Sequence, residues 1–207
     1  MDSEDSLYIT HLSRDKKFAK ILAGREPFIL SRRRAVYLHL CFSIMSQQLS
    51  TKVADIIRQR FLKLYVGKPS PEQILATTHE TLRSIGLSGA KANYVHNVAR
   101  FAVESGMDQK TLAKMENEEV IEYLTKIKGV GRWTVEMLLM FTLGREDVFA
   151  VDDLGIQQAM IAIYKLDKTD KKKLKTDMLR ISAKWSPYRS FACLHLWRHK
   201  DKKPEIE

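Results

Sequence analysis

Three observations on the sequence predict an all-α protein. Its 207 residues include only nine glycines and five prolines, and these fall between periodic segments rather than within them. Apolar residues recur at helical spacing, as at Val53, Ile56, Ile57, Phe61 and Leu64. No alternating run of useful length predicts a strand. We therefore expect one helical domain, or two small helical lobes around a shared cleft.

The first helices are expected between residues 34 and 106. Residues 34–50 are apolar on most sides, which predicts a buried helix. Residues 52–65 follow with one apolar face, and a Gly-Lys-Pro-Ser-Pro stretch ends that helix. Two short helices, over 72–78 and 79–86, precede an amphipathic helix over 90–106.

The remaining helices follow a second series of breaks. Residues 116–129 lead into a glycine turn, and residues 132–144 are apolar nearly all round, which predicts a central core helix. A linker and then a helix are expected over 145–166. A basic helix over 169–185 begins at a Thr or Asp cap, and residues 186–199 close the fold.

The charge and the cysteines narrow the possible functions. Lys and Arg outnumber Asp and Glu by 35 to 25, so the net charge is +10; this is compatible with a polyanionic partner or with a basic protein that has no nucleic-acid role. Cys41 and Cys193 lie in apolar segments and should be buried free thiols in a reducing compartment. Two thiolates cannot supply the four ligands of a typical iron–sulfur cluster. His195 and His199 lack an acid that would complete a metal site.

No targeting or membrane segment is expected. The acidic N-terminus, MDSEDSLY, has no apolar core and does not look like a secretory signal. No stretch approaches 18 uncharged apolar residues, so we expect no membrane span and an intracellular protein.

The stretch KGVGRWTVEML, Lys128–Leu138, places a glycine turn before a helix. Gly129 can take a positive φ and end the preceding helix, and Gly131 removes a Cβ where a ligand could come close. The N-terminus of the following helix offers backbone N–H groups that can bind a DNA phosphate without sequence preference. The spacing matches neither a dinucleotide fingerprint nor a Walker loop. A plain glycine break between two core helices remains the alternative.

Two adjacent acids, Asp152 and Asp153, follow about twenty residues later in VDDLGIQQ. Either carboxylate could cap the next helix, and both could do nothing more than that. A basic chain that binds DNA would not usually present carboxylates to it. A carboxylate near a DNA-binding surface therefore suggests chemistry on the sugar.

Together these stretches resemble a known family. KGVGRWTVEMLLM followed by DVFAVDDLGI is similar to the helix-hairpin-helix, Gly/Pro-rich loop and Asp motif of base-excision DNA glycosylases, and most similar to the 3-methyladenine-DNA glycosylase branch. SIMSQQLSTKVA, IGLSGAKA and KWSPYRSFACLHLW extend the resemblance over about residues 35 to 200. It implies two helical lobes with an active-site cleft between them: residues 34–141, ending in the hairpin, and residues 1–33 plus 142–207.

Departures from the family pattern indicate the type of reaction. Trp133 stands where members resembling endonuclease III carry a lysine nucleophile, and the four-cysteine cluster of such members is missing. The resemblance therefore implies hydrolysis without a Schiff base, hence no lyase activity, and neither an iron–sulfur cluster nor another cofactor. Lys128 replaces a proline that is frequent before the first hairpin glycine. Hairpins of this family can hold a monovalent cation through main-chain carbonyls; no other metal is expected.

The resemblance also implies roles for particular residues. Asp153 would be the catalytic carboxylate, and Asp152 would be a structural cap. Gln48, with Leu49 second, would be the wedge that fills the gap left by a flipped base. The base pocket would include Trp133, Tyr188, Met137 and Leu154, and the DNA-binding set would be Lys128, Gly129, Val130, Gly131, Arg132 and Thr134, with Gly89 and Lys91 in a second glycine turn. Core packing for the aromatic residues and for Leu49, and a helix-end position for Gln48, remain alternatives.

These expectations define a function and its competitors. The chain would be a monomeric, monofunctional glycosylase that flips alkylated purines of the 3-methyladenine type out of double-stranded DNA and leaves an abasic site in base excision repair. It would be found with DNA, in a prokaryotic nucleoid or a eukaryotic nucleus. The alternatives are a glycosylase for uracil or an oxidised base, and a non-enzymatic helix-hairpin-helix DNA-binding protein.

Overall fold

The computed structural model of the protein describes residues 4–30 and 35–201, with side chains from residue 7 onward. Within those ranges the secondary structure is helical and no strand occurs, so the all-α prediction is confirmed. The described chain divides into two compact units: residues 35–143, here the central unit, and residues 4–30 with 144–201, here the terminal unit. The boundary expected at residues 33 and 34 lies outside the described residues.

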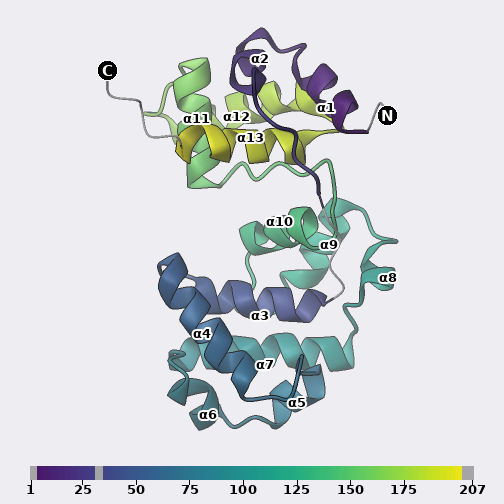
Figure 1. The fold of residues 1–207 in the computed structure, drawn as a ribbon, viewed down its shortest axis with the longest axis vertical. Coiled ribbons are helices and arrows are strands. Elements are labelled where there is room, and N and C mark those ends of the chain that lie inside the picture. The colour runs from purple at the N-terminus through teal and green to yellow at the C-terminus, as the bar shows by residue number, and fades with distance from the viewer. Residues whose placement is uncertain (1–3, 31–34, 202–207) are drawn as a thin grey trace. The chain divides into compact units, whose positions relative to one another are not determined.

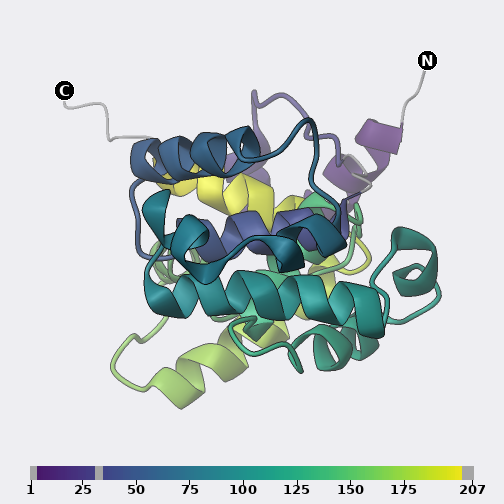
Figure 2. The ribbon, with the colours of Figure 1, turned by 90° about the horizontal axis from the view of Figure 1, so that it is seen from below.

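The central unit contains the helices α3 to α10 (Figure 1). They are α3 (Val36–Ser46), α4 (Thr51–Lys63), α5 (Pro71–Ala76), α6 (His79–Ser84), α7 (Gly89–Glu104), α8 (Gln109–Leu112), α9 (Asn117–Leu124) and α10 (Arg132–Phe141). α3 is buried because it packs against α4, α7 and α10. Figure 2 shows α7 running beside α3 and the short helices α5 and α6.

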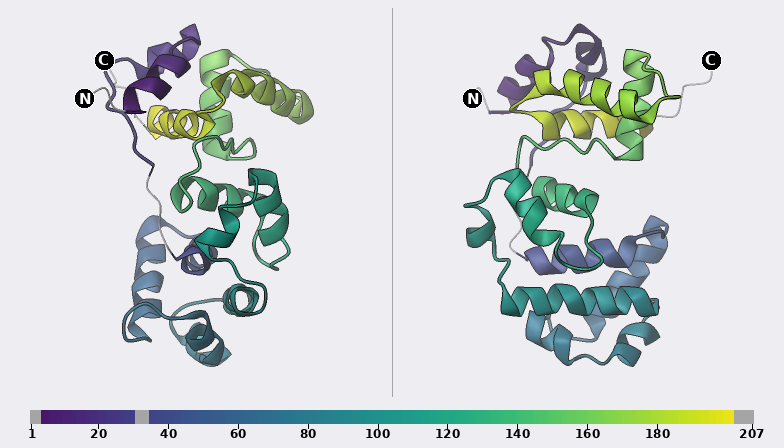
Figure 3. Two further views of the ribbon diagram at one scale, coloured as in Figure 1. Left: turned by 90° about the vertical axis from the view of Figure 1, so that its right-hand side faces the viewer. Right: turned by 180° about the vertical axis from the view of Figure 1, so that it is seen from behind.

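The terminal unit combines the two ends of the chain. It contains α1 (Glu4–Leu12), α2 (Lys16–Leu22), α11 (Leu154–Tyr164), α12 (Lys171–Ser182), the 3-10 helix η1 (Ala183–Trp185) and α13 (Arg189–Asp201). α13 packs against α11 and α2, and Figure 3 shows these helices from two further sides. The core is aromatic: Trp185, 1% exposed, has the rings of Phe18 and Phe149 at 4.8 and 5.9 Å between centroids.

Side-chain caps explain where many helices begin. Ser50, Ser70, Thr78, Ser88 and Asp108 each accept a hydrogen bond from a backbone N–H in the first turn of the helix that follows. The sequence did not predict α1 and α2. For α2 a signal was present, since the Asp15 side chain caps it by accepting from the N–H groups of Lys17 and Phe18.

Two predicted helices end earlier or begin later than expected. The helix expected over 34–50 ends at Ser46: Gln47 leaves the helical conformation with ψ 130°, and Gln48 is left-handed with φ +59° in the turn before α4. The helix expected over 186–199 begins only at Arg189.

Cys41 and Cys193 are buried free thiols, as predicted, and burial raises the pKa of Cys41 to about 12. No helix among the described residues is both long and apolar enough to cross a membrane.

Candidate active site

The turn between α9 and α10 requires its first glycine. Gly129 has φ +103°, and a Cβ built on it would lie 2.7 Å from Cβ and Cδ1 of Tyr94 and closer still to Cγ. Any side chain would therefore meet both backbone strain and the Tyr94 ring. Gly131 differs: its φ is −97°, and no atom lies within 4 Å of where its Cβ would be. The fold of the central unit therefore leaves room for a side chain at position 131.

Side chains of α7 and of the turn after α3 donate hydrogen bonds to carbonyl oxygens of the hairpin. Asn97 of α7 donates from Nδ2 to the carbonyl oxygen of Lys128 at 3.1 Å. Gln47 donates from Nε2 to the carbonyl oxygen of Gly129 at 3.5 Å. Gly131 is the N-cap of α10 and brings no capping side chain, so the start of α10 is a backbone surface with a positive dipole end.

The two cations beside the hairpin differ in their surroundings. Lys128 is exposed. Arg132 pairs with two carboxylates: NH1 donates to Glu118 at 2.8 Å and Nε to the buried Glu136 at 3.0 Å. The Glu118 carboxylate, which accepts hydrogen bonds from Arg132, raises the pKa of the Arg132 guanidinium above its ordinary value. Acids on α9 and α10 therefore offset the positive charge of the Arg132 side chain at this surface.

The remaining residues of the predicted DNA-binding set differ in how far their side chains are buried. Thr134 and Val130 are 4% and 5% exposed, so their side chains pack inside and only their backbone can meet a ligand. Gly89 is the first residue of α7, where a Cβ would make an ordinary contact at 3.8 Å with Cε1 of His79.

Lys91 has an internal role that the sequence did not reveal. Its Nζ donates to the carbonyl oxygens of Gln47 at 2.6 Å and Met45 at 3.0 Å, at the C-terminus of α3. Partial burial lowers the pKa of Lys91. The ammonium thus ties α7 to the turn that carries Gln48 and Leu49, and it is not available as a charge on the surface.

Both wedge candidates are exposed on that turn. Leu49 is 37% exposed, so the alternative of a core leucine is wrong. Gln48 follows the end of α3 and also lines an open cavity of about 520 Å³.

The cavity brings together three predicted site residues within the central unit. Trp133 and Met137 of α10 line it with Gln48. Trp133 is 45% exposed, which contradicts core packing for this ring, whereas Met137 is 9% exposed and forms part of the wall. The sequence missed the opposite wall, formed by His39, Phe42, Ser43 and Ser46 on one face of α3 and by Arg58. Their helical spacing in the segment 34–50 was the available signal.

Asp153 is held at the start of α11 in the terminal unit. Its Oδ1 accepts from the N–H of Ile156 at 2.9 Å and from Nε1 of Trp197 at 2.8 Å. Gly155 leaves room for this arrangement, because a Cβ there would make tight contacts of 3.1 Å with Asp153 Oδ1 and Trp197 Cδ1. Two donors thus fix the orientation of a half-buried carboxylate.

Asp152 has a different role from the expected one. It is exposed and pairs with Nζ of Lys175 on α12, at 2.9 Å from each oxygen. The cap of α11 is Asp153. The assignment of Asp152 as the cap is therefore wrong, and Asp153 combines the capping geometry with the position predicted for the catalytic carboxylate.

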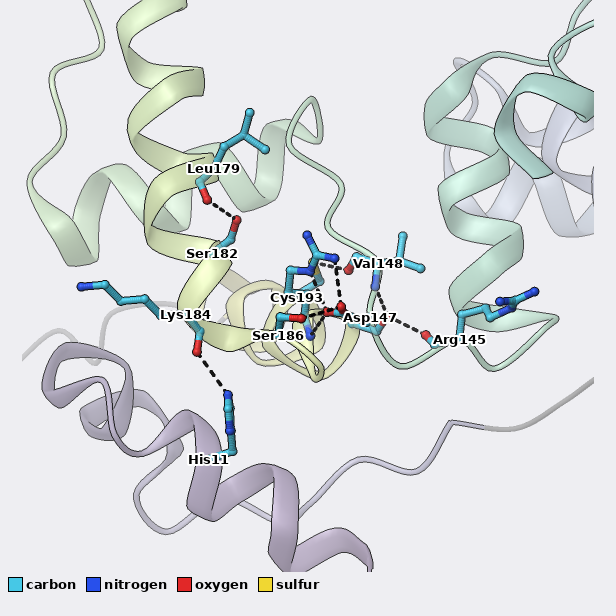
Figure 4. A network of polar contacts seen from close by, with 11 residues as sticks. His11, Arg145, Asp147, Val148, Leu179, Ser182, Lys184, Ser186 and Cys193 are labelled. Carbon is cyan, nitrogen blue, oxygen red and sulfur yellow. Dashed lines mark hydrogen bonds and ion pairs between the residues drawn. The ribbon is translucent and has the colours of Figure 1, made fainter. Parts of the chain in front are cut away.

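A polar network fastens the segment before Asp153 to the start of α13 (Figure 4). Asp147 accepts from Nε and NH2 of Arg189 at 2.6 and 2.9 Å and from the hydroxyl of Ser186 at 2.7 Å. Ser190 donates from Oγ to the carbonyl of Arg145 at 2.6 Å and accepts from the N–H of Val148 at 3.0 Å. The arginine holds the pKa of Asp147 below its usual range against the desolvation that would raise it.

Comparison with known proteins assigns this arrangement to a family. The family model of HhH-GPD superfamily base excision DNA repair proteins matches residues 41–184, well over half of the chain and all of the segment from α4 to α12. The chain belongs to the HhH-GPD superfamily. This confirms the resemblance drawn from the hairpin and the Asp motif.

Similar HhH-GPD proteins carry related names. DNA-3-methyladenine glycosylase 1 of Schizosaccharomyces pombe is 34% identical over 186 residues, which cover 88% of this chain and 80% of that relative. A 3-methyladenine DNA glycosylase of the same organism, solved in complex with abasic DNA, has a TM-score of 0.81 and 32% identity over 95% of this chain and 100% of its own. A Bacillus halodurans DNA-3-methyladenine glycosidase has a TM-score of 0.84 and 33% identity, covering 97% and 91%.

The remaining predicted pocket residues of this HhH-GPD chain lie in the terminal unit with Asp153. Leu154 is the first residue of α11 and is 65% exposed. Tyr188 lines a small hollow of about 170 Å³ with Tyr8 and Phe191, whose rings lie 6.4 and 6.2 Å from its own. The sequence missed Trp197, although it lies in the KWSPYRSFACLHLW stretch that carried part of the resemblance.

Proposed function

We propose that this HhH-GPD chain is a monofunctional DNA glycosylase that flips alkylated purines out of double-stranded DNA and hydrolyses their N-glycosidic bond, leaving an abasic site. The observation that carries the proposal is the Asp153 carboxylate, oriented by a backbone N–H and by the Trp197 indole in a superfamily of base excision repair proteins. The similar proteins named as 3-methyladenine glycosylases support the choice of alkylated purines.

The chemistry follows from charge. An N-alkylated purine such as 3-methyladenine is positively charged and is already a good leaving group, so its departure needs no general acid. Loss of the base leaves an oxocarbenium-like sugar, and the Asp153 carboxylate stabilises that charge. The same carboxylate can orient or deprotonate the attacking water.

Recognition of the base is assigned to the aromatic residues. The exposed face of Trp133 can hold a cationic base by cation–π attraction, with Met137 beside it in the cavity wall. The family resemblance also assigns Tyr188 and Leu154 of the terminal unit to base recognition. Because Trp133 replaces the lysine nucleophile of lyase-type members, no Schiff base forms and the strand is not nicked.

DNA is held in this scheme without sequence preference. The backbone from Lys128 to Thr134 binds one phosphate at the start of α10, assisted by the charge of Lys128. Gln48, or Leu49 beside it, enters the duplex in place of the flipped base. We propose that the protein acts as a monomer, that a monovalent cation can bind the hairpin carbonyls, and that no other cofactor takes part.

The deciding experiment offers DNA methylated at purines and, separately, duplexes that contain uracil or 8-oxoguanine, and identifies the released bases. Release of 3-methyladenine with an intact strand supports the proposal. Release of uracil or 8-oxoguanine alone assigns the chain to another lesion, and tight binding without product makes it a binding protein. Asp153→Asn, which keeps the shape of the side chain, should lower the rate of base release by about a hundredfold or more while leaving DNA binding intact. Full activity in that variant would remove Asp153 from the mechanism.

A further inference from the structure

The terminal unit contains a basic hollow that the proposed mechanism does not use. It has a volume of about 570 Å³ and lies where the α1–α2 turn meets the ends of α11 and α12. Five cationic side chains line it: Arg14, Lys16, Lys17, Arg180 and Lys184. They come from two segments about 165 residues apart, so the cluster exists only in the folded protein.

Among the described side chains, most of these cations have no acidic partner. Arg180 pairs with Asp177 at 3.0 Å, and Lys17 lies over the ring of Tyr164 at 5.5 Å from its centroid. For Arg14, Lys16 and Lys184 no ion pair is present among the described side chains, and all three are exposed. Like charges gathered in a concave surface repel one another and create a strong local positive potential.

The one carboxylate in the hollow does not offset that potential by pairing with a cation. Asp15 Oδ1 accepts from the backbone N–H groups of Lys17 and Phe18, and Oδ2 accepts from the Tyr164 hydroxyl at 2.7 Å and the Trp185 indole at 3.4 Å. All of these donors are neutral. Asp15 therefore organises the floor of the hollow and leaves the cations on its rim available to an external anion.

A hydrogen bond within the terminal unit connects the two segments that carry the cations of the hollow. His11, at the end of α1, is hydrogen bonded through Nε2 to the carbonyl oxygen of Lys184 at 3.1 Å, a contact that Figure 4 shows. This bond connects the two cationic segments. The hollow is thus part of the fold of the terminal unit, and its lysine and arginine side chains project from a braced backbone.

The chemistry of the lining favours nucleic acid over a protein partner. Tight protein interfaces depend on large apolar anchors that become buried on binding. Of the apolar lining residues, Trp185 and Ile181 are buried, at 1% and 9% exposure, and Tyr164 and Leu166 are only partly exposed. The lining residues that are exposed are all cationic, which is the footprint expected for a phosphate backbone.

We propose that the basic hollow is a second DNA-phosphate binding surface, located in a different unit from the hairpin. It would bind the duplex without regard to sequence or damage and so increase the affinity for undamaged DNA. The inference takes from the proposed function only that DNA is the partner. It does not depend on which base is released, or on whether any is.

The test measures binding to an undamaged duplex as a function of salt, using the triple variant Arg14→Ala/Lys16→Ala/Lys184→Ala. Each phosphate contact contributes about 0.9 to the slope of log K against log salt, so the slope should become shallower by about 2 to 3. Affinity at low salt should fall at least about tenfold. Thermal unfolding confirms that the variant is folded.

A control variant with the same net charge tests whether the position of the removed cations matters. Lys110→Ala/Lys114→Ala/Lys168→Ala also removes three exposed cations, none of which lines the hollow. It should keep a salt slope within about one unit of the wild type. Equal losses in both variants would mean that only net charge matters, and wild-type binding by the first variant would mean that the hollow does not meet DNA; either outcome overturns the proposal.

A third arm tests the other class of partner. Poly-glutamate is titrated into the wild-type protein and the hollow variant in the absence of DNA. If it binds the wild type and not the variant, while both bind DNA equally, the hollow serves an acidic protein segment and the proposal is wrong. The binding assay uses undamaged DNA, so it can succeed even if no base release is found, and the two proposals fail separately.

Discussion

The substitution Gly129→Ala tests the structural basis of the hairpin. An alanine there must adopt φ +103°, for which roughly 1–2 kcal/mol is expected in the left-handed region. Its Cβ would also lie 2.7 Å from Cβ and from Cδ1 of Tyr94, and overpacking of this kind costs about 1–3 kcal/mol. The free energy of unfolding should therefore fall by about 2–5 kcal/mol.

Chemical and thermal unfolding measure this loss. For a chain of this size the melting temperature should fall by roughly 5–15 °C. Gly131→Ala is the control, because its φ of −97° is allowed and nothing lies within 4 Å of the new methyl group; its stability should stay within about 0.5 kcal/mol of the wild type. Its DNA affinity should nevertheless fall, since the methyl group faces the side from which a phosphate would approach.

A double-mutant cycle with Tyr94→Ala isolates the clash. Removing the ring should relieve the clash with Cγ and Cδ1 and leave the 2.7 Å contact with Cβ and the backbone strain, with a coupling energy of about 1 kcal/mol or more. The reasoning is refuted if Gly129→Ala unfolds like the wild type. It is also refuted if Gly131→Ala proves to be the more destabilised variant.

Three further predictions concern the contacts that support the site. Trp197→Phe removes the indole donor to Asp153; because a hydrogen bond to a charged group is worth about 1.5–3 kcal/mol, the rate of base release should fall about tenfold to a hundredfold. An unchanged single-turnover rate would show that the indole does not position the carboxylate. Lys91→Met leaves two carbonyls at the end of α3 without their ammonium donor, so unfolding in denaturant should show a loss of about 1–3 kcal/mol. Burial lowers the pKa of His195 to about 4, so the unfolded chain binds the extra proton first as the pH falls. Stability should therefore decrease from about pH 6.5 down to about pH 4, by up to about 3 kcal/mol, and His195→Gln should reduce that decrease in pH-dependent melting curves.

Local chemistry made much of the fold predictable. Apolar spacing and side-chain caps such as Ser50 and Ser88 are encoded within a few residues, so most helices were expected where they occur. Boundaries failed where a turn depends on distant support. The end of α3 at Ser46 is one example, because Lys91 of α7 binds the last carbonyls of that helix.

Part of the candidate site could also be predicted from the sequence. Gly129 could be found because its role depends on local backbone geometry, a positive φ. Asp153 was assigned from the resemblance to a known family, whereas its N-cap role was predicted for the wrong acid, Asp152. Trp197 could not be placed against Asp153 from the sequence, because 44 residues separate them. Arg132 looked like a free charge until Glu118, which belongs to the preceding helix, was placed beside it.

The sequence alone determined the helical class and the glycine turn, since each of these depends on residue type at short spacing. Its resemblance to a known family added the candidate catalytic carboxylate and Trp133 in place of a lysine nucleophile. Only the tertiary structure decided which charges remain available. It neutralised Arg132, turned Lys91 inward and gathered Arg14, Lys16 and Lys184 around one hollow. The physical reason is that the groups around a charged side chain decide whether its charge is available to a ligand, and folding brings those groups from distant parts of the chain.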